Sequence, residues 1–243
     1  MFQLSGDVGA EHGDAESQFR IGELFYQGEN IPDDEREAWM KFKFFGQGAI
    51  SPIYYKKTDG WEKGLEEAGK WYHKAAKQGH IKSEYRLGCL YSDLSRLGDP
   101  LIYDKNREKY KKTAEQWYLK AAKKGYADAQ HSLGTFYEFV KDDSGWAARW
   151  YQEAAEQGHA MAQYCLGRLM GGDAYWFRKA AEQGLAEAQC ALGVLYHIGD
   201  GVPQDSQIAK AWLEQAANRG YADARRYLDL WYPQKSWLNK LFS

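Results

Sequence analysis

A short block that recurs along the chain decides the fold: it first reads "WYHKAAKQG" at residues 71–79. Its echoes are "WYLKAAKKG" at 117–125, "WYQEAAEQG" at 150–158, "WFRKAAEQG" at 176–184 and "WLEQAANRG" at 212–220, with a weaker "MKFKFFGQG" that ends at Gly48. The closing glycines are separated by 31, 46, 33, 26 and 36 residues. Self-similarity of this kind is typical of repeat architectures, and the scatter indicates loops of different length.

A second pattern follows the strong glycines, as in "GLAEAQCALGVLY" at 184–196. Ala188, Leu192 and Leu195 recur at helical spacing, and the block's alanines and long side chains also favour helix. Gly220 stands where a left-handed helix cap is expected. Each unit is therefore predicted as helix A, a loop, helix B and a glycine turn. Stacked hairpins of this type bury their apolar stripes as a solenoid.

Glycines at the centre of helix A predict close contact with a neighbouring helix. Gly134, Gly167 and Gly193 each cost about 1 kcal/mol relative to alanine, so a packing gain must compensate. The Trp and Tyr residues at the start of helix B are expected to fill the remaining space. In the connector "GDGVPQD" at 199–205, Asp205 is predicted to cap helix B. The connector lacks the spacing and terminal Glu of a calcium loop.

These residues resemble the Sel1-like repeat family, which is related to the tetratricopeptide repeats. The stretch "AQCALGVLYHIGDGVPQDSQIAKAWLEQAANRG" at 188–220 matches the family pattern nearly throughout. The resemblance implies an all-α, right-handed α/α superhelical solenoid of about six helical hairpins. We expect a single domain over 1–243 with regular repeats over about 13–232. Irregular insertions are expected near 49–65 and 95–116, and a capping helix over 233–243.

Composition narrows the functional classes. The chain has 243 residues, 16% of them aromatic, and a net charge of −2. This charge argues against a nucleic-acid binder that neutralises many phosphates. No apolar run is long enough for a membrane span, and the N-terminus shows no secretory signal, which predicts a cytoplasmic protein, or a periplasmic one if a leader was trimmed. Cys89, Cys165 and Cys190 are expected to be free, buried thiols in helices.

Motifs that carry chemistry are missing from the sequence. It contains no P-loop, no GxSxG and no HExxH, and no two histidines lie at i, i+4 spacing. We therefore expect no enzyme activity, no cofactor and no metal site. The capping-box spacing of Asp34 and Glu37 has a structural explanation, as do His80 and His159, which follow glycine turns.

A partner-binding surface is predicted from positions counted from each glycine. Positions +5, +8, +9 and +12 form the packed stripe of helix A, while +3, +6, +10 and +13 lie largely on the other side. By resemblance to tetratricopeptide arrays, helix A lines a concave face. The candidate residues on that face are Glu16, Phe19, Glu23, Tyr26, Tyr85, His131, Glu138, Tyr164, Arg168, His197 and Arg226, with Asp128, Glu187 and Cys190 in the same rows. The alternative is that the +6 side chains pack between adjacent A helices.

The resemblance implies a module that binds another protein on its concave face, as an adaptor or scaffold. In bacteria the family also admits immunity proteins, host-interaction proteins and envelope-assembly factors. A small chain with irregular insertions fits an immunity protein that neutralises one toxin. A glycan or cell-wall ligand is the alternative, because the aromatic row would also stack sugars. An enzyme ranks behind both.

Overall fold

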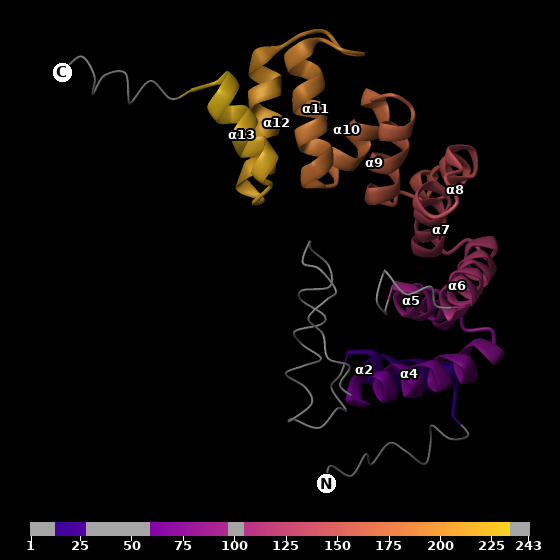
Figure 1. Cartoon of the computed structure of the whole chain (residues 1–243). Helices are drawn as coiled ribbons and strands as arrows, with labels where there is room; N and C mark the ends of the chain where they lie inside the picture. Colours follow the sequence, from indigo (N-terminus) through magenta and orange to yellow (C-terminus); the bar gives the residue numbers. More distant parts are fainter. Residues whose placement is uncertain (1–12, 28–58, 97–104, 234–243) are drawn as a thin grey trace. The chain divides into compact units, whose positions relative to one another are not determined.

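The computed structural model describes residues 13–27, 59–96 and 105–233, and every regular element in these ranges is an α-helix (Figure 1). The helices are α2 Ala15–Gln27, α4 Asp59–Lys77, α5 Ile81–Arg96, α6 Lys105–Lys123, α7 Ala127–Phe139, α8 Ser144–Glu156, α9 Ala160–Leu169, α10 Ala174–Glu182, α11 Ala186–Ile198, α12 Ser206–Asn218 and α13 Ala222–Trp231. Two compact units contain them, residues 1–129 and 130–243, with the boundary inside α7. The single domain and the handedness of a superhelix stay predictions.

A bulky side chain seated on a glycine defines each helix pair. The glycine at +9 of helix A faces the second residue of the Trp block in helix B. In the pair of Gly22 and Tyr72, a Cβ atom added to the glycine would lie 2.5 Å from the tyrosine ring. The same contact joins Gly88 to Tyr118, Gly134 to Tyr151, Gly167 to Phe177 and Gly193 to Leu213, with Cβ distances of 2.4 to 2.9 Å. The close approach predicted from the mid-helix glycines is confirmed. Glycine is required there because any Cβ would overlap the ring or branched side chain.

The same contact also joins α2 to α4. Tyr72 of α4 packs on Gly22 of α2, and residues 28–58, which separate these two helices in the sequence, lie outside the described residues. The echo that ends at Gly48 falls within that range. The described residues hold the pairs α2–α4, α5–α6, α7–α8, α9–α10 and α11–α12, followed by α13.

Each helix B ends in the same hydrogen-bonded turn. Gly220 has φ of 86°, as predicted, and its N–H donates to Ala217 O at 2.9 Å. The next N–H, of Tyr221, donates to Ala216 O at 3.1 Å. This arrangement closes the helix through the left-handed glycine. The paired alanines of the block thus supply two terminal carbonyls as well as small buried side chains.

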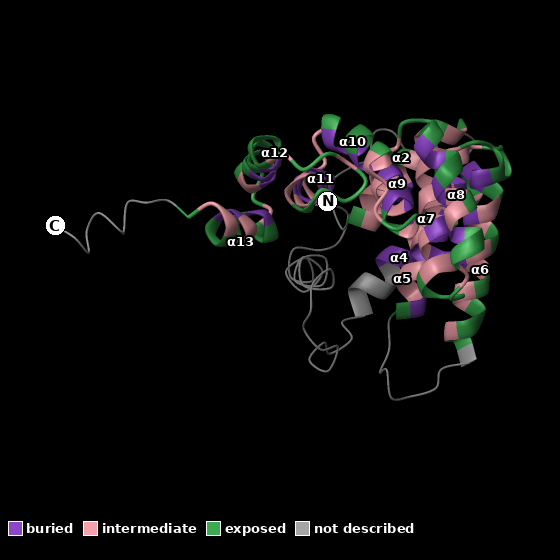
Figure 2. Ribbon diagram, turned by 90° about the horizontal axis from the view of Figure 1, so that it is seen from above, coloured by how far each residue is buried: buried purple, intermediate pink, exposed green. Residues whose placement is uncertain are grey.

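The buried stripe of helix A is wider than the sequence pattern predicts (Figure 2). In α11 the predicted positions +5, +8 and +9 are buried, whereas +12, Tyr196, is half-buried. Positions +4 and +11, Ala188 and Leu195, are buried as well. A helix enclosed by its own pair partner and by the next pair buries a broader face than a helix packed on one side.

Parts of both predicted insertions extend helix B. Residues 59–65 belong to the start of α4, and residues 105–116 belong to the start of α6. Asp205 caps α12 as predicted, since its Oδ1 accepts from the N–H groups of Gln207 and Ile208 at 2.9 and 3.0 Å. The Asp34–Glu37 capping box and the helix predicted over 233–243 fall outside the described residues, apart from Pro233.

Candidate protein-interaction surface

Three A helices of the second unit enclose an open depression of about 260 Å³. Tyr164 of α9 forms one side, α11 forms the floor, and Tyr221, Asp223 and Tyr227, from the N-cap to the middle of α13, form the other side. The remaining lining residues are Phe177, Glu187, Cys190, Ala191, Val194 and Leu195. We call this set the A-helix depression. Its floor is apolar, while its rim carries aromatic rings and carboxylates, the composition of an anchor pocket with a polar rim.

The repeat positions each of these side chains. Tyr164 stands at +6 and its ring lies 5.6 Å from that of Phe177, the residue seated on Gly167. Glu187 and Asp223 both stand at +3, in the first turns of α11 and α13. Acidic residues are favoured there because the helix N-terminus carries partial positive charge. The helical turns that follow Gly184 and Gly220 therefore each place one carboxylate at the rim.

Burial and the two carboxylates perturb the groups inside the depression. Burial raises the pKa of the Cys190 thiol to about 11, and the charge of Asp223 adds to the shift. The pKa of the Tyr164 hydroxyl is raised first by burial, with Glu187 contributing. The Tyr221 hydroxyl also has a raised pKa, for which burial is the main cause and Asp223 and Glu187 are minor ones. Negative potential from the rim thus reaches the floor.

Only one carboxylate of the rim has an ion-pair partner within the described chain. Arg226 Nη1 lies 3.0 Å from Asp223 Oδ1, with side chains 82% and 52% exposed. Such an exposed pair contributes about 0–1 kcal/mol. Glu187 makes no hydrogen bond or ion pair with another described residue.

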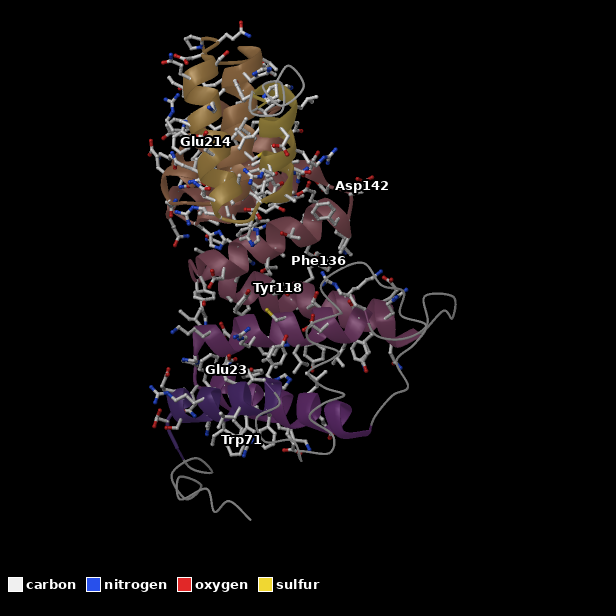
Figure 3. The ribbon with its side chains drawn as sticks, turned by 90° about the vertical axis from the view of Figure 1, so that its left-hand side faces the viewer. Glu23, Trp71, Tyr118, Phe136, Asp142 and Glu214 are labelled. Atoms are coloured by element: carbon white, nitrogen blue, oxygen red, sulfur yellow. The ribbon has the colours of Figure 1, made fainter. Side chains whose placement is uncertain are left out.

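Two predicted glutamates are used inside the molecule. Glu23, which is labelled in Figure 3, accepts from the Tyr72 hydroxyl and from Arg86 Nη2, both at 2.6 Å. Glu138 in the second unit accepts from the Tyr151 hydroxyl at 2.9 Å and pairs with Arg168. In each case the tyrosine comes from the same helix pair and the arginine from the next helix A. These clusters join successive pairs and occupy Glu23, Glu138 and Arg168 in packing.

The aromatic residues at +6 contact the residue at +1 of the following repeat. Ring centroids lie 4.9 Å apart for Phe19 and His80, 5.3 Å for Tyr85 and Tyr126, and 4.8 Å for His131 and His159. All three +6 side chains are half-buried. These contacts support the alternative reading of the +6 row as inter-repeat packing at these positions.

The other predicted residues have mixed surroundings. The Tyr26 hydroxyl donates to Asp93, and the His197 ring stacks on Trp231 with centroids 3.9 Å apart. Glu16 is exposed and pairs with Arg20 and His80. Of the eleven candidate residues, Tyr164 alone lines the A-helix depression, and Arg226 adjoins it through Asp223. Whether any of them binds a partner stays a prediction.

Sequence reasoning missed Tyr221, Tyr227 and Asp223. The +3 row contained the signal for Asp223, which has the same register as Glu187. Tyr221 could have been predicted from position +1, where a ring recurs directly after the glycine, as in His80 and Tyr126. Tyr227 stands at +7, and no repeated pattern in the sequence marks it.

Two other surfaces are open. A shallow depression of about 480 Å³ in the first unit lies between the turns at 79–82 and 124–126. In the second unit, the ends of helix pairs near the A–B connectors expose large apolar side chains, including Phe139 at 71%, Met170 at 57% and Ile198 at 55%. The depression of the first unit is lined by two lysines, Lys82 and Lys124, and by no carboxylate, whereas two carboxylates line the A-helix depression.

Cysteine and metal chemistry find little support in the described residues. Cys89, Cys165 and Cys190 are free thiols, and burial raises the pKa of each. Cys190 is buried and the other two are half-buried. In residues 13–27, 59–96 and 105–233, no three His, Cys, Asp or Glu side chains are placed to hold a metal ion. No helix in the same ranges has the length and apolar character needed to cross a membrane.

Solved structures with a similar chain path include two Sel1-type proteins. The chain is 31% identical to c5321, a protective antigen of uropathogenic Escherichia coli that displays an SLR fold, with a TM-score of 0.60. That alignment covers 88% of this chain and 40% of c5321, so this chain spans well under two thirds of its length. A Sel1 repeat protein from Oxalobacter formigenes is 25% identical, with a TM-score of 0.65 and coverage of 96% of this chain and 83% of the other.

A more distant match is the immunity protein Pa5087 from Pseudomonas aeruginosa. It is 20% identical with a TM-score of 0.45, and the alignment covers 88% of this chain and 69% of that one. A likeness this low carries no argument about function. A search of curated proteins found no match to this sequence.

The Sel1 repeat matches residues 15–40, 59–80, 81–126, 127–159, 174–185 and 186–221. The first range contains α2 and continues to residue 40, and the second begins at the first residue of α4. The chain therefore belongs to the Sel1 repeat family, and its predicted all-α repeat solenoid fold is confirmed.

Proposed function

We propose that this protein binds a partner protein through the A-helix depression. Sel1 repeats mediate protein–protein interaction and generally act as non-enzymatic scaffolds. The observation that carries the proposal is the apolar floor of α11 between aromatic walls from α9 and α13. Buried aromatic anchors surrounded by a polar rim dominate the energetics of protein interfaces.

Charge reversal at the rim tests this proposal. In the double variant Glu187→Lys and Asp223→Lys, two cations replace two carboxylates that make no buried contact, so the fold is expected to survive. The matched control is Glu182→Lys with Glu214→Lys, which makes the same charge change on exposed helix B residues. Affinity capture from the native organism, followed by mass spectrometry, is the measurement.

The proposal predicts a stoichiometric protein that the wild type and the control capture and the rim variant does not. A partner that the folded rim variant still captures contradicts binding at this site. In that case the shallow depression of the first unit becomes the next surface to change.

Within this function we propose an immunity role, in which the partner is a toxin that the protein neutralises in the cytoplasm. The support is indirect: it is the membership of the chain in the Sel1 repeat family, which in bacteria also admits immunity proteins. Co-expression with toxins encoded near its gene should protect cells from one of them. Loss of protection in the rim variant, but not in the control, would link the role to the depression. The absence of protection from any neighbouring toxin argues against it.

A glycan or cell-wall ligand is the second candidate, favoured by the three tyrosines that line the depression. Tyrosine rings present apolar faces to sugars and to peptides alike. Sedimentation with purified peptidoglycan separates the two: binding that the rim variant retains favours sugar stacking over a charged protein interface.

A further inference from the structure

We propose that the A-helix depression receives a positively charged side chain, arginine or lysine, of the bound protein. This inference rests on the proposed function and specifies the chemistry of the residue that enters. It follows from the identity and placement of the groups around the floor rather than from the size of the depression.

The lining of the depression includes two carboxylates, Glu187 of α11 and Asp223 of α13. Glu187 and Asp223 come from equivalent positions on α11 and α13, so each faces the depression from its own helix N-terminus. The described residues leave Glu187 without an ion-pair partner, and Asp223 pairs only with the exposed Arg226. A guanidinium or ammonium group placed between them gains charge-assisted hydrogen bonds from both.

The walls suit the stem and the head of such a side chain. Tyr164, Tyr221 and Tyr227 contribute aromatic rings to the lining, and the Tyr227 ring also stacks on Trp231 with centroids 4.6 Å apart. A cation is attracted to the face of such a ring by the ring quadrupole. Ala191, Val194 and Leu195 form an apolar floor on which the methylene stem of arginine or lysine packs. An acidic side chain would be repelled by the same rim carboxylates, and a neutral donor would form weaker hydrogen bonds with them than a cation does.

The cations already near the depression do not fill it. Arg168 is engaged with Glu138, and Arg226 is 82% exposed in its pair with Asp223. Replacing the Arg226–Asp223 ion pair by one between Asp223 and an arginine of the partner costs little, since an exposed pair contributes about 0–1 kcal/mol. Arg226 is therefore a competitor, and its removal is expected to strengthen binding.

A small probe tests the inference without any knowledge of the partner. We would titrate the full chain with N-acetyl-arginine amide at millimolar concentrations and follow the methyl signals of Ala191, Val194 and Leu195 by NMR. N-acetyl-citrulline amide, which has the same shape and no charge, is the matched probe. The Glu187→Gln/Asp223→Asn and Arg226→Ala variants are compared with Glu182→Gln, which changes one exposed helix B carboxylate.

The arginine probe is expected to shift these methyl signals saturably, and roughly tenfold more weakly when the two carboxylates are neutralised. Arg226→Ala should tighten binding, and Glu182→Gln should leave it unchanged. Equal shifts with the citrulline probe, or equal binding by the neutralised variant, overturns the inference. If capture of a partner depends on the rim while the arginine probe fails to bind, the proposed function stands and this inference falls.

Discussion

The helix pairs α5–α6 and α9–α10 link their two helices through the same position with different side chains, ion pairs in the first and an amide hydrogen bond in the second. In both, the buried residue at +5 of helix A connects to the end of helix B. In the amide pair, α9–α10, Gln163 accepts from Gln183 Nε2 at 2.8 Å and donates to Ala155 O of the preceding helix at 3.0 Å. In the charged pair, α5–α6, the +5 residue is Glu84, which lies 2.9 Å from Lys120 Nζ and 2.8 Å from Lys124 Nζ.

The difference shows that the repeat requires a polar link at +5 and leaves its charge free to vary. A glutamine both donates and accepts, so it ties its own pair to the preceding one. A carboxylate only accepts, and Glu84 Oε2 has no hydrogen-bond partner among the described residues although the side chain is fully buried. The charged pair therefore relies on lysines that reach in from the surface. Its stability should respond to salt more than that of the amide pair.

The largest effect is expected from placing the charge in the amide pair. In Gln163→Glu, a buried carboxylate loses the donor to Ala155 O and finds an amide, Gln183, where the charged pair has Lys124. Leaving a buried charge uncompensated costs about 3–5 kcal/mol. Urea unfolding at neutral pH measures the loss, which should shrink as pH falls and the new carboxyl is protonated.

The rescue variant decides whether charge is the cause. Adding Gln183→Lys to Gln163→Glu recreates the charged pair and should recover most of the stability, whereas Gln183→Lys alone should not stabilise the protein. If Gln163→Glu unfolds at the same urea concentration as the wild type, the link at +5 does not matter and the comparison fails.

In both pairs an aromatic ring of helix B packs on the central glycine of helix A. Substitution of that glycine by alanine tests whether the contact is equally tight in the two pairs. A Cβ on Gly88 would lie 2.4 Å from the Tyr118 ring, and one on Gly167 would lie 2.9 Å from the Phe177 ring. Overpacking of this kind costs about 1–3 kcal/mol, more than the helix propensity that alanine adds. We expect Gly88→Ala to destabilise more than Gly167→Ala in thermal unfolding.

Gly69→Ala is the control for these two variants. Its Cβ would meet Leu90 at 3.7 Å, an ordinary contact, so the variant should gain up to about 1 kcal/mol from helix propensity alone. A gain in stability for Gly88→Ala would mean that the ring moves aside, and that the glycines do not set the spacing of the pairs.

The same comparison explains what the sequence could predict. The repeated glycines, alanines and aromatic residues act locally or between paired helices, so they predicted the helices, the turns and the contact at Gly167. The sequence alone could not show that α2 pairs with α4, because residues 28–58 lie between the two helices and contain a glycine block of their own that ends at Gly48. Only the seating of Tyr72 on Gly22 reveals that pair.

The candidate site was harder to predict because its lining crosses repeats. Counting positions within one helix finds Tyr164 and Glu187, but not that Tyr221 and Tyr227 of a later repeat lie opposite them. The same counting placed Glu138 and Arg168 on a free surface, whereas each uses the other as its partner across successive pairs. Ion pairs and ring contacts between repeats depend on stacking geometry, which a periodic pattern does not encode.

A smaller effect is expected when the charge is removed from the charged pair. Glu84→Gln loses the attraction of two lysines that are 48% and 36% exposed, but it supplies an amide donor like that of Gln163. We expect a change below about 1 kcal/mol in unfolding free energy, since partly exposed ion pairs contribute little. The sharper measurement is salt dependence: raising NaCl should weaken the wild type more than the variant, because salt screens the lysine–glutamate attraction. Equal salt dependence would show that the lysines contribute packing only.

The smallest effect is expected from pH. His73 of α4 lies 3.3 Å from the Tyr91 hydroxyl and 5.3 Å, between ring centroids, from Trp117 of α6. Burial lowers the pKa of His73 in the folded state, and the charges of Lys77 and Lys120 lower it further. The unfolded chain therefore binds the proton more readily, so stability present at neutral pH is lost as pH falls through about 6.5, the ordinary value for histidine.

Unfolding midpoints of the wild type and of His73→Phe, measured between neutral pH and pH 5, test this difference in proton binding. The phenylalanine keeps the ring contacts and cannot titrate, so its midpoint should fall less over this range. If the unfolding midpoints of the two proteins fall equally with pH, the loss of stability in acid comes from groups other than His73. The salt response of Glu84 would then be the only electrostatic property that separates the charged pair and its neighbour α4 from the amide pair.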